Sequence, residues 1–224
     1  MKLTEEQITY IENYIKSFDI KYYEVYMEIL DHMILSVEAI LEENKEITFE
    51  DAVLKAKVDG FGKKGFRGMM DEKLKLAQNQ ARKQNNKMIK EYFTFPKIVM
   101  TLSVFVGYFL FLHLFEDPKL PNLLSISVVA FLSIFQIIYT YKYRKINEMY
   151  LLKYQILTQM YSLSFATLNI TNALNILCKE TLDFNHILMR LFMTSVFTFS
   201  LISLLVYIEI RKKTIEELKT QIFV

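Results

Sequence analysis

Three groups of polar residues in this sequence have types and spacings that could carry chemistry. The first joins Asp31 and His32 to Glu28, which lies one helical turn before the histidine. This trio could hold a metal ion, but His32 is the only histidine in residues 1–97, and a metal site needs more converging ligands. A hydrogen bond from His32 to Glu28, or packing of His32 against a neighbouring helix, explains the arrangement better. We expect no metal site.

The second group is a glycine-rich segment, Gly60-Phe61-Gly62-Lys63-Lys64-Gly65. Its spacing matches a dinucleotide-binding fingerprint, which requires a preceding strand that the sequence does not predict. Four of the five glycines lie at 60, 62, 65 and 68, which favours a helix end followed by a tight turn. The alternative is an anion or lipid-headgroup site. Its contacts would be Lys63, Lys64 and Arg67, joined by Arg82, Lys83 and Lys87 further along.

The third group is a stripe of polar residues within an apolar segment: Thr158, Ser162, Asn169 and Asn172. At 100° per residue they share one face of a helix. Such side chains usually form hydrogen bonds between membrane helices, each worth roughly 0.6 kcal/mol. A pathway for a small molecule or ion is the alternative. No nucleophile and base occur together, and Cys178 is the only cysteine, so we expect neither an enzyme nor a cofactor.

The distribution of charge predicts a membrane protein of the all-α class. Residues 1–97 carry 33 of the 52 charged side chains. Uncharged runs of 18 to 25 residues fill much of the rest, and about 20 apolar residues cross a bilayer as a helix. We predict a cytoplasmic helical domain with a basic stalk at 1–93, four transmembrane helices within 94–210, and a cytoplasmic tail at 211–224. The predicted spans are 98–115, 120–141, 154–178 and 191–208.

The orientation of the spans follows from the basic residues in the short loops that flank them. One side has 13 Lys and Arg residues and the other has 3. We therefore predict a multi-pass protein of the bacterial inner membrane with both termini in the cytoplasm. The loop between the first two spans is little more than residues 116–119, which predicts that these spans form a tight antiparallel hairpin.

Residues 1–93, hereafter the head, are predicted to be mostly helical. Thr4 with Gln7 forms a capping box, and Thr48 with Asp51 offers a second N-terminal cap. The predicted helices run to about residue 18, from about 20 to 43, from 48 to about 60, and from about 68 to 93. In the second helix, apolar residues at three- and four-residue spacing predict one buried stripe: Tyr23, Met27, Leu30, Ile34, Val37 and Leu41.

Charge is divided unequally within the head. Residues 1–60 have a net charge of −8 and residues 61–97 a net charge of +7. The two parts could attract each other within the chain. Alternatively, the basic part rests on anionic lipid headgroups, where each Lys or Arg is worth about 1 kcal/mol, and leaves the acidic part facing a partner.

The head resembles a known family, the HTH-associated α-helical signalling domain. The matching residues are Glu28-Ile29-Leu30-Asp31-His32, then Glu38, then Phe49-Glu50-Asp51-Ala52 and Phe61-Gly62. Members of this family occur beside PadR-type transcription regulators. The resemblance implies a cytoplasmic protein partner of that type, with partner-binding residues Glu28, Asp31, His32 and Glu38.

We therefore predict a membrane protein whose head binds a cytoplasmic partner in signalling or in the control of a transcription regulator. A net charge of +2 argues against direct binding of nucleic acid. The alternative is a small transporter or accessory membrane subunit that uses the polar third span. A homo-oligomer is a further possibility, because a four-helix bundle buries little surface alone.

Overall fold

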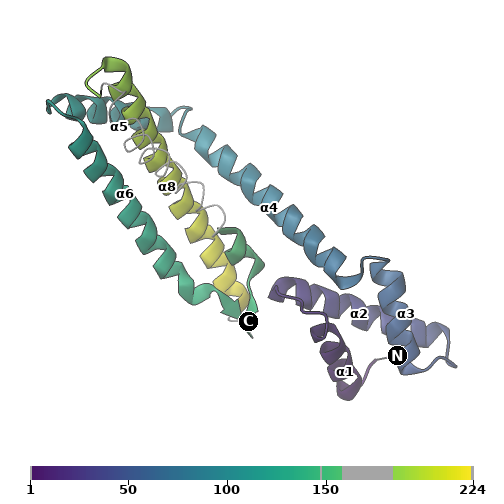
Figure 1. The fold of residues 1–224 in the computed structure, drawn as a ribbon. Coiled ribbons are helices and arrows are strands. Elements are labelled where there is room, and N and C mark those ends of the chain that lie inside the picture. The colour runs from purple at the N-terminus through teal and green to yellow at the C-terminus, as the bar shows by residue number, and fades with distance from the viewer. Residues whose placement is uncertain (1, 147, 158–183, 223–224) are drawn as a thin grey trace. The chain divides into compact units, whose positions relative to one another are not determined.

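The structure of the protein is a computed structural model that describes residues 2–146, 148–157 and 184–222 (Figure 1). The described chain is all-α apart from one hairpin with two residues in each strand. It divides into two compact units. Residues 1–79 and 144–155 form the first unit, and residues 80–143 and 156–224 form the second. The predicted fold class is thus confirmed at the level of secondary structure.

The first unit begins with three helices, α1 (Glu5–Lys16), α2 (Tyr23–Glu43) and α3 (Phe49–Phe61). Both predicted caps are confirmed. The Thr4 hydroxyl accepts the Gln7 N–H while the Gln7 side chain accepts the Thr4 N–H, and the Thr48 hydroxyl accepts the Asp51 N–H. A fourth helix, α4 (Gly65–Glu91), begins in this unit and continues into the second.

The core of the first unit lies between α1, α2 and α3. Ile11 and Ile15 of α1 face the buried side of α2, and Ala52, Val53 and Ala56 of α3 complete the core. The buried residues of α2 are Val25, Tyr26, Ile29, Leu30, Met33 and Val37. The predicted stripe was therefore wrong in register. Only Leu30 and Val37 belong to it, and Met27 is 41% exposed. Because α2 is apolar on most sides, its neighbours decide which face is buried.

A segment distant in sequence completes the first unit. Strands β1 (Lys145–Ile146) and β2 (Met149–Tyr150) form an antiparallel hairpin. The Tyr150 N–H donates to the Lys21 carbonyl at 2.9 Å, and Tyr150 pairs with Tyr22 as a parallel bridge. This pairing holds residues 21 and 22 extended, which explains why α2 begins at Tyr23 instead of the predicted residue 20.

The second unit contains the end of α4 together with α5 (Lys97–His113), α6 (Lys119–Thr140), η1 (Tyr141–Tyr143) and α8 (Ile187–Ile222). The 36 residues of α8 extend about 54 Å, far beyond the predicted span of 191–208. The residues predicted as a tail are helical to residue 222 because no glycine or proline interrupts them. Most of the predicted third span lies outside the described residues.

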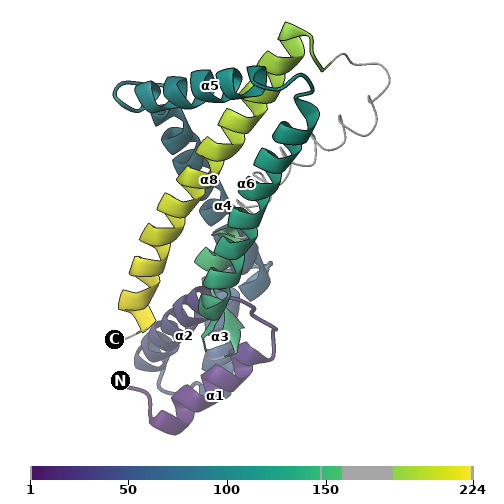
Figure 2. The same cartoon turned by 90° about the vertical axis from the view of Figure 1, so that its left-hand side faces the viewer.

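The predicted hairpin of the first two spans is not observed. Helix α5 crosses α8 and packs on it, while α6 runs alongside α8 (Figure 2). Tyr108 of α5 stacks on Phe197 of α8 with ring centroids 3.8 Å apart. Arg190 of α8, which is 8% exposed, donates to the carbonyls of Leu112 and Phe115 at 2.6 and 3.3 Å. These contacts fix the end of α5 to α8, and the Tyr108 hydroxyl also donates to Asn122 Oδ1 of α6 at 3.0 Å.

Two helices are long and apolar enough to cross a membrane, at 119–139 and 187–219. Helix α5 has the same character but is shorter, with 17 residues. Only 22% of the apolar window in α6 is buried. Large apolar side chains that are more than half exposed lie along both α5 and α6: Val99, Leu102, Val106, Leu110, Val128, Phe131, Phe135 and Ile138.

Candidate functional site

Residues from two of the predicted sites lie around one cavity in the first unit. This cavity, hereafter the mixed cavity, has a volume of about 670 Å³. It lies where the end of α3, the glycine turn and the start of α4 meet, and His32 of α2 also lines it. Lys63 and Lys64 contribute the basic side, and Asp71 and Glu72 contribute an acidic side. The structure thus brings together His32 and two lysines that lie 31 and 32 residues after it in sequence.

The four predicted partner-binding residues differ in what they contact. Asp31 and His32 are exposed, and the His32 ring meets the edge of Phe61 with centroids 6.5 Å apart. Glu28 forms an ion pair with Lys73 of α4 at 2.5 Å. Glu38 accepts the Leu3 N–H at 3.0 Å. Of the two explanations offered for His32, the described contacts show packing against a neighbouring helix, because Glu28 bonds to Lys73.

The glycine-rich segment forms the predicted helix end and turn. Gly62 follows α3 with φ of +56°, and Gly65 opens α4 with φ of +57°. Residues with a side chain rarely adopt a positive φ, so both positions strongly favour glycine. Gly68 is also constrained, because a Cβ there would lie 2.3 Å from Lys64 Cβ. The turn therefore sets the positions of Lys63 and Lys64.

The six predicted anion-contacting residues fall into two places. Lys63, Lys64 and Arg67 surround the glycine turn of the first unit. Arg82, Lys83 and Lys87 are exposed on the part of α4 that belongs to the second unit. The polar stripe Thr158, Ser162, Asn169 and Asn172 lies outside the described residues.

The packing of residues 144–155 on the head was not predicted from the sequence. Besides the Tyr150 contacts, the Leu152 N–H donates to the Glu24 carboxylate at 2.8 Å. Tyr150 is flanked by two cations, with Arg144 Cζ at 4.8 Å and Lys145 Nζ at 5.0 Å from its ring centroid. Leu151, Leu152 and Tyr154 are buried. Residues 144–155, most of the loop between the second and third predicted spans, are thus an integral part of the first unit.

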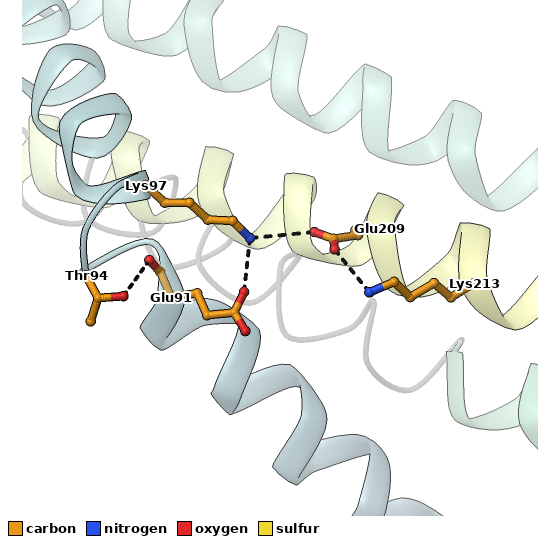
Figure 3. Close-up of polar contacts among 5 residues, drawn as sticks. All are labelled: Glu91, Thr94, Lys97, Glu209 and Lys213. Atoms are coloured by element: carbon orange, nitrogen blue, oxygen red, sulfur yellow. Dashed lines mark hydrogen bonds and ion pairs between the residues drawn. The ribbon is translucent and has the colours of Figure 1, made fainter.

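A charged network in the second unit joins the end of α4, the start of α5 and the middle of α8 (Figure 3). Lys97 Nζ lies 3.0 Å from Glu91 Oε2 and 4.0 Å from Glu209 Oε2. Lys213 Nζ lies 3.2 Å from Glu209 Oε1. The side-chain hydrogen bond from Lys97 lowers the pKa of Glu91 below its ordinary value of 4.5. Because these side chains are partly exposed, the network orients three helices more than it stabilises them.

The groups available around the mixed cavity are charged and polar side chains that can form hydrogen bonds and ion pairs. Among the described residues, no three His, Cys, Asp or Glu side chains come together as metal ligands would. The mixed cavity offers an imidazole side chain, exposed ammonium groups and two carboxylates. Such a set can bind the charged side chains of a protein partner.

Comparison with known proteins finds no matching family model, curated protein or solved structure for this chain. The resemblance of the head to a signalling domain therefore stays a prediction from its residues.

The packing of residues 144–155 predicts the effect of removing Glu24. The change Glu24→Ala should speed hydrogen exchange of the Leu152 amide at least about tenfold, because a hydrogen bond to a charged group contributes roughly 1.5–3 kcal/mol. Exchange is measured by mass spectrometry on the full chain. Glu43→Ala, an exposed residue at the end of the same helix, is the control. Unchanged exchange at residues 150–152 would rule out this contact.

The charged network predicts a titration. Because the folded pKa of Glu91 is lowered, its contribution to stability is present above the unfolded pKa, near 4.5, and is lost as pH falls through the lower folded pKa. Lys97→Met should raise the pKa of Glu91 towards 4.5, as followed by carboxyl ¹³C NMR in detergent micelles. Lys90→Met, which removes an adjacent exposed cation, should change it less. An equal response to both substitutions would contradict the hydrogen bond as the cause.

Proposed function

We propose that the protein is a multi-pass protein of the bacterial inner membrane whose cytoplasmic head binds a protein partner and reports the state of the membrane region to it. The observation that carries this proposal is that the first unit is built from two segments distant in sequence. It joins residues 1–79 to residues 144–155, and the intervening chain contains the apolar helices α5 and α6.

The same observation supports the topology. Two segments that fold into one unit lie on one side of a membrane, so the chain between them crosses an even number of times. If α6 crosses, as its length and hydropathy permit, a second crossing must occur in that stretch, and α5 is the other apolar helix there. To cross as well, α5 would have to turn from its position across α8 into line with α6 (Figure 2). The many basic residues near 82–97 and 142–153 favour the cytoplasm for this side. With two further spans, the C-terminus is cytoplasmic as well.

The first unit has three covalent connections to the second unit. One is α4, a single helix of 27 residues that continues towards α5. The other two are the ends of the segment at 144–155, which follows η1 and α6 and continues at residue 156. A change in the spacing of the spans would pull on the hydrogen bond of Tyr150 with Lys21, just before α2, and on that of Leu152 with Glu24 of α2. In this mechanism α2 carries the signal, and it also carries Asp31 and His32.

Asp31 and His32 are the residues of the predicted set best placed to contact a partner, because both are exposed and His32 lines the mixed cavity. Glu28 and Glu38 support the surface from within the head through Lys73 and the Leu3 N–H. The resemblance of the head favours a transcription regulator of the PadR type as the partner. Regulation of transcription then passes through that partner and needs no contact of this chain with nucleic acid.

This function predicts what a photo-crosslinking amino acid captures in native membranes. Placed at Asp31, it should capture a DNA-binding regulator that the same group at Glu43 does not capture, and His32→Ala should reduce that capture severalfold. Capture is measured by mass spectrometry after purification of the full chain. Recovery of only membrane proteins at both positions would favour a transporter or accessory subunit instead.

The topology predicts which positions a membrane-impermeant maleimide labels. In a Cys178→Ser background, cysteine is introduced singly at Lys2, Lys119 and Lys219. In intact spheroplasts only position 119 should react, and the other two should react after permeabilisation. Protection of position 119 would show that α5 and α6 do not both cross.

A further inference from the structure

A second cavity lies on the other side of the glycine turn and differs in its charge. This cavity, hereafter the basic cavity, has a volume of about 750 Å³ and is lined by four cationic side chains: Lys57, Lys63, Lys64 and Arg67. No acidic residue lines it, whereas Asp71 and Glu72 line the mixed cavity. In the described part of the chain, none of the four cations forms an ion pair.

The floor of the basic cavity is aromatic. Phe66 is 1% exposed, and Phe18 meets it edge to face with ring centroids 5.1 Å apart. Lys57 is held above these rings, with its Nζ 4.3 Å from the Phe18 centroid and 6.0 Å from that of Phe66. A Cβ at Gly65 would lie 3.8 Å from Lys57 Cε, so this side chain also reaches the turn. Lys57 is therefore placed by packing and not by a carboxylate.

The wall of the basic cavity includes an exposed apolar side chain. Val58 is 65% exposed and lies beside Lys57 in sequence. Like charges gathered on one surface repel one another, and an anion bound among them relieves that repulsion. The cations match a ligand that has an anionic end. The aromatic rings and the exposed Val58 match an apolar end of the same ligand.

We propose that the basic cavity binds a phosphate group carried on an apolar molecule. Lysine and arginine donors recognise phosphate oxygens, and the lysine stems, Val58 and Phe18 contact the apolar part. The phosphate can come from the headgroup of an anionic lipid or from a soluble phosphate compound. This site lies beside the partner surface and is independent of which protein binds there, although Lys63 and Lys64 line both cavities.

The absence of tryptophan from the chain allows a direct test. Val58→Trp places a single fluorophore at the exposed wall of the basic cavity. The full-length variant is reconstituted in nanodiscs of phosphatidylcholine, of phosphatidylcholine with phosphatidylglycerol, and of phosphatidylcholine with added pyrophosphate. A shift of the emission with phosphatidylglycerol alone identifies a lipid headgroup as the source. A shift with pyrophosphate supports the site and identifies a soluble source.

Charge variants separate the cavity from general electrostatic attraction. A triple variant should bind the probe at least about tenfold more weakly, as judged from the probe concentration that gives half of the emission shift. Its changes are Lys63→Gln, Lys64→Gln and Arg67→Gln, and each removes a cation worth about 1 kcal/mol near an anionic surface. Lys2→Gln, Lys45→Gln and Lys55→Gln combined remove the same charge from exposed positions that do not line the cavity and should leave binding unchanged. An equal loss in both triple variants, or no emission change with either probe, overturns the proposal. The crosslinking at Asp31 does not depend on this result.

Discussion

The structure depends on one constraint, which is that the apolar faces of α5, α6 and α8 must be kept from water. Soluble monomers rarely expose contiguous apolar patches larger than a few hundred Å². Here apolar side chains from Val99 to Leu110 and from Val128 to Ile138 remain exposed after the chain has folded. A bilayer removes this cost, and it also requires that polar groups be satisfied within the protein. The guanidinium of Arg190 meets that requirement at the end of α5, where two carbonyls and the Asn185 side chain accept its N–H groups.

Under the two proposals, the first unit serves two kinds of ligand at one turn. Gly62 and Gly65 reverse the chain between α3 and α4 and leave Lys63 and Lys64 between two cavities of different charge. An anion bound on one side would reduce the positive potential felt on the other. Binding of a phosphate compound and binding of a protein partner would then influence each other through shared lysines, with no change of fold.

Features set by neighbouring residues could be predicted from the sequence, whereas features set by distant contacts could not. The caps at Thr4 and Thr48 depend on residues three positions away and were confirmed. The buried face of α2 depends on where α1 and α3 pack, so its periodicity misplaced it by one or two residues. The start of α2 depends on Tyr150, more than 120 residues away. Hydropathy falls after residue 208, which marks the end of an apolar span. Helix α8 nevertheless continues to Ile222, because Lys, Arg and Glu have high helix propensity.

The order of synthesis gives the segment at 144–155 a further meaning. The ribosome completes residues 1–79 first, but the head lacks its last element until residue 155 has been made. At about 5–20 residues per second, this interval is roughly 4 to 15 s. During it, α5 and α6 leave the ribosome. If these helices insert as proposed, the first unit is completed only after both have reached the membrane, and until then the α2 surface that packs on residues 144–155 stays uncovered.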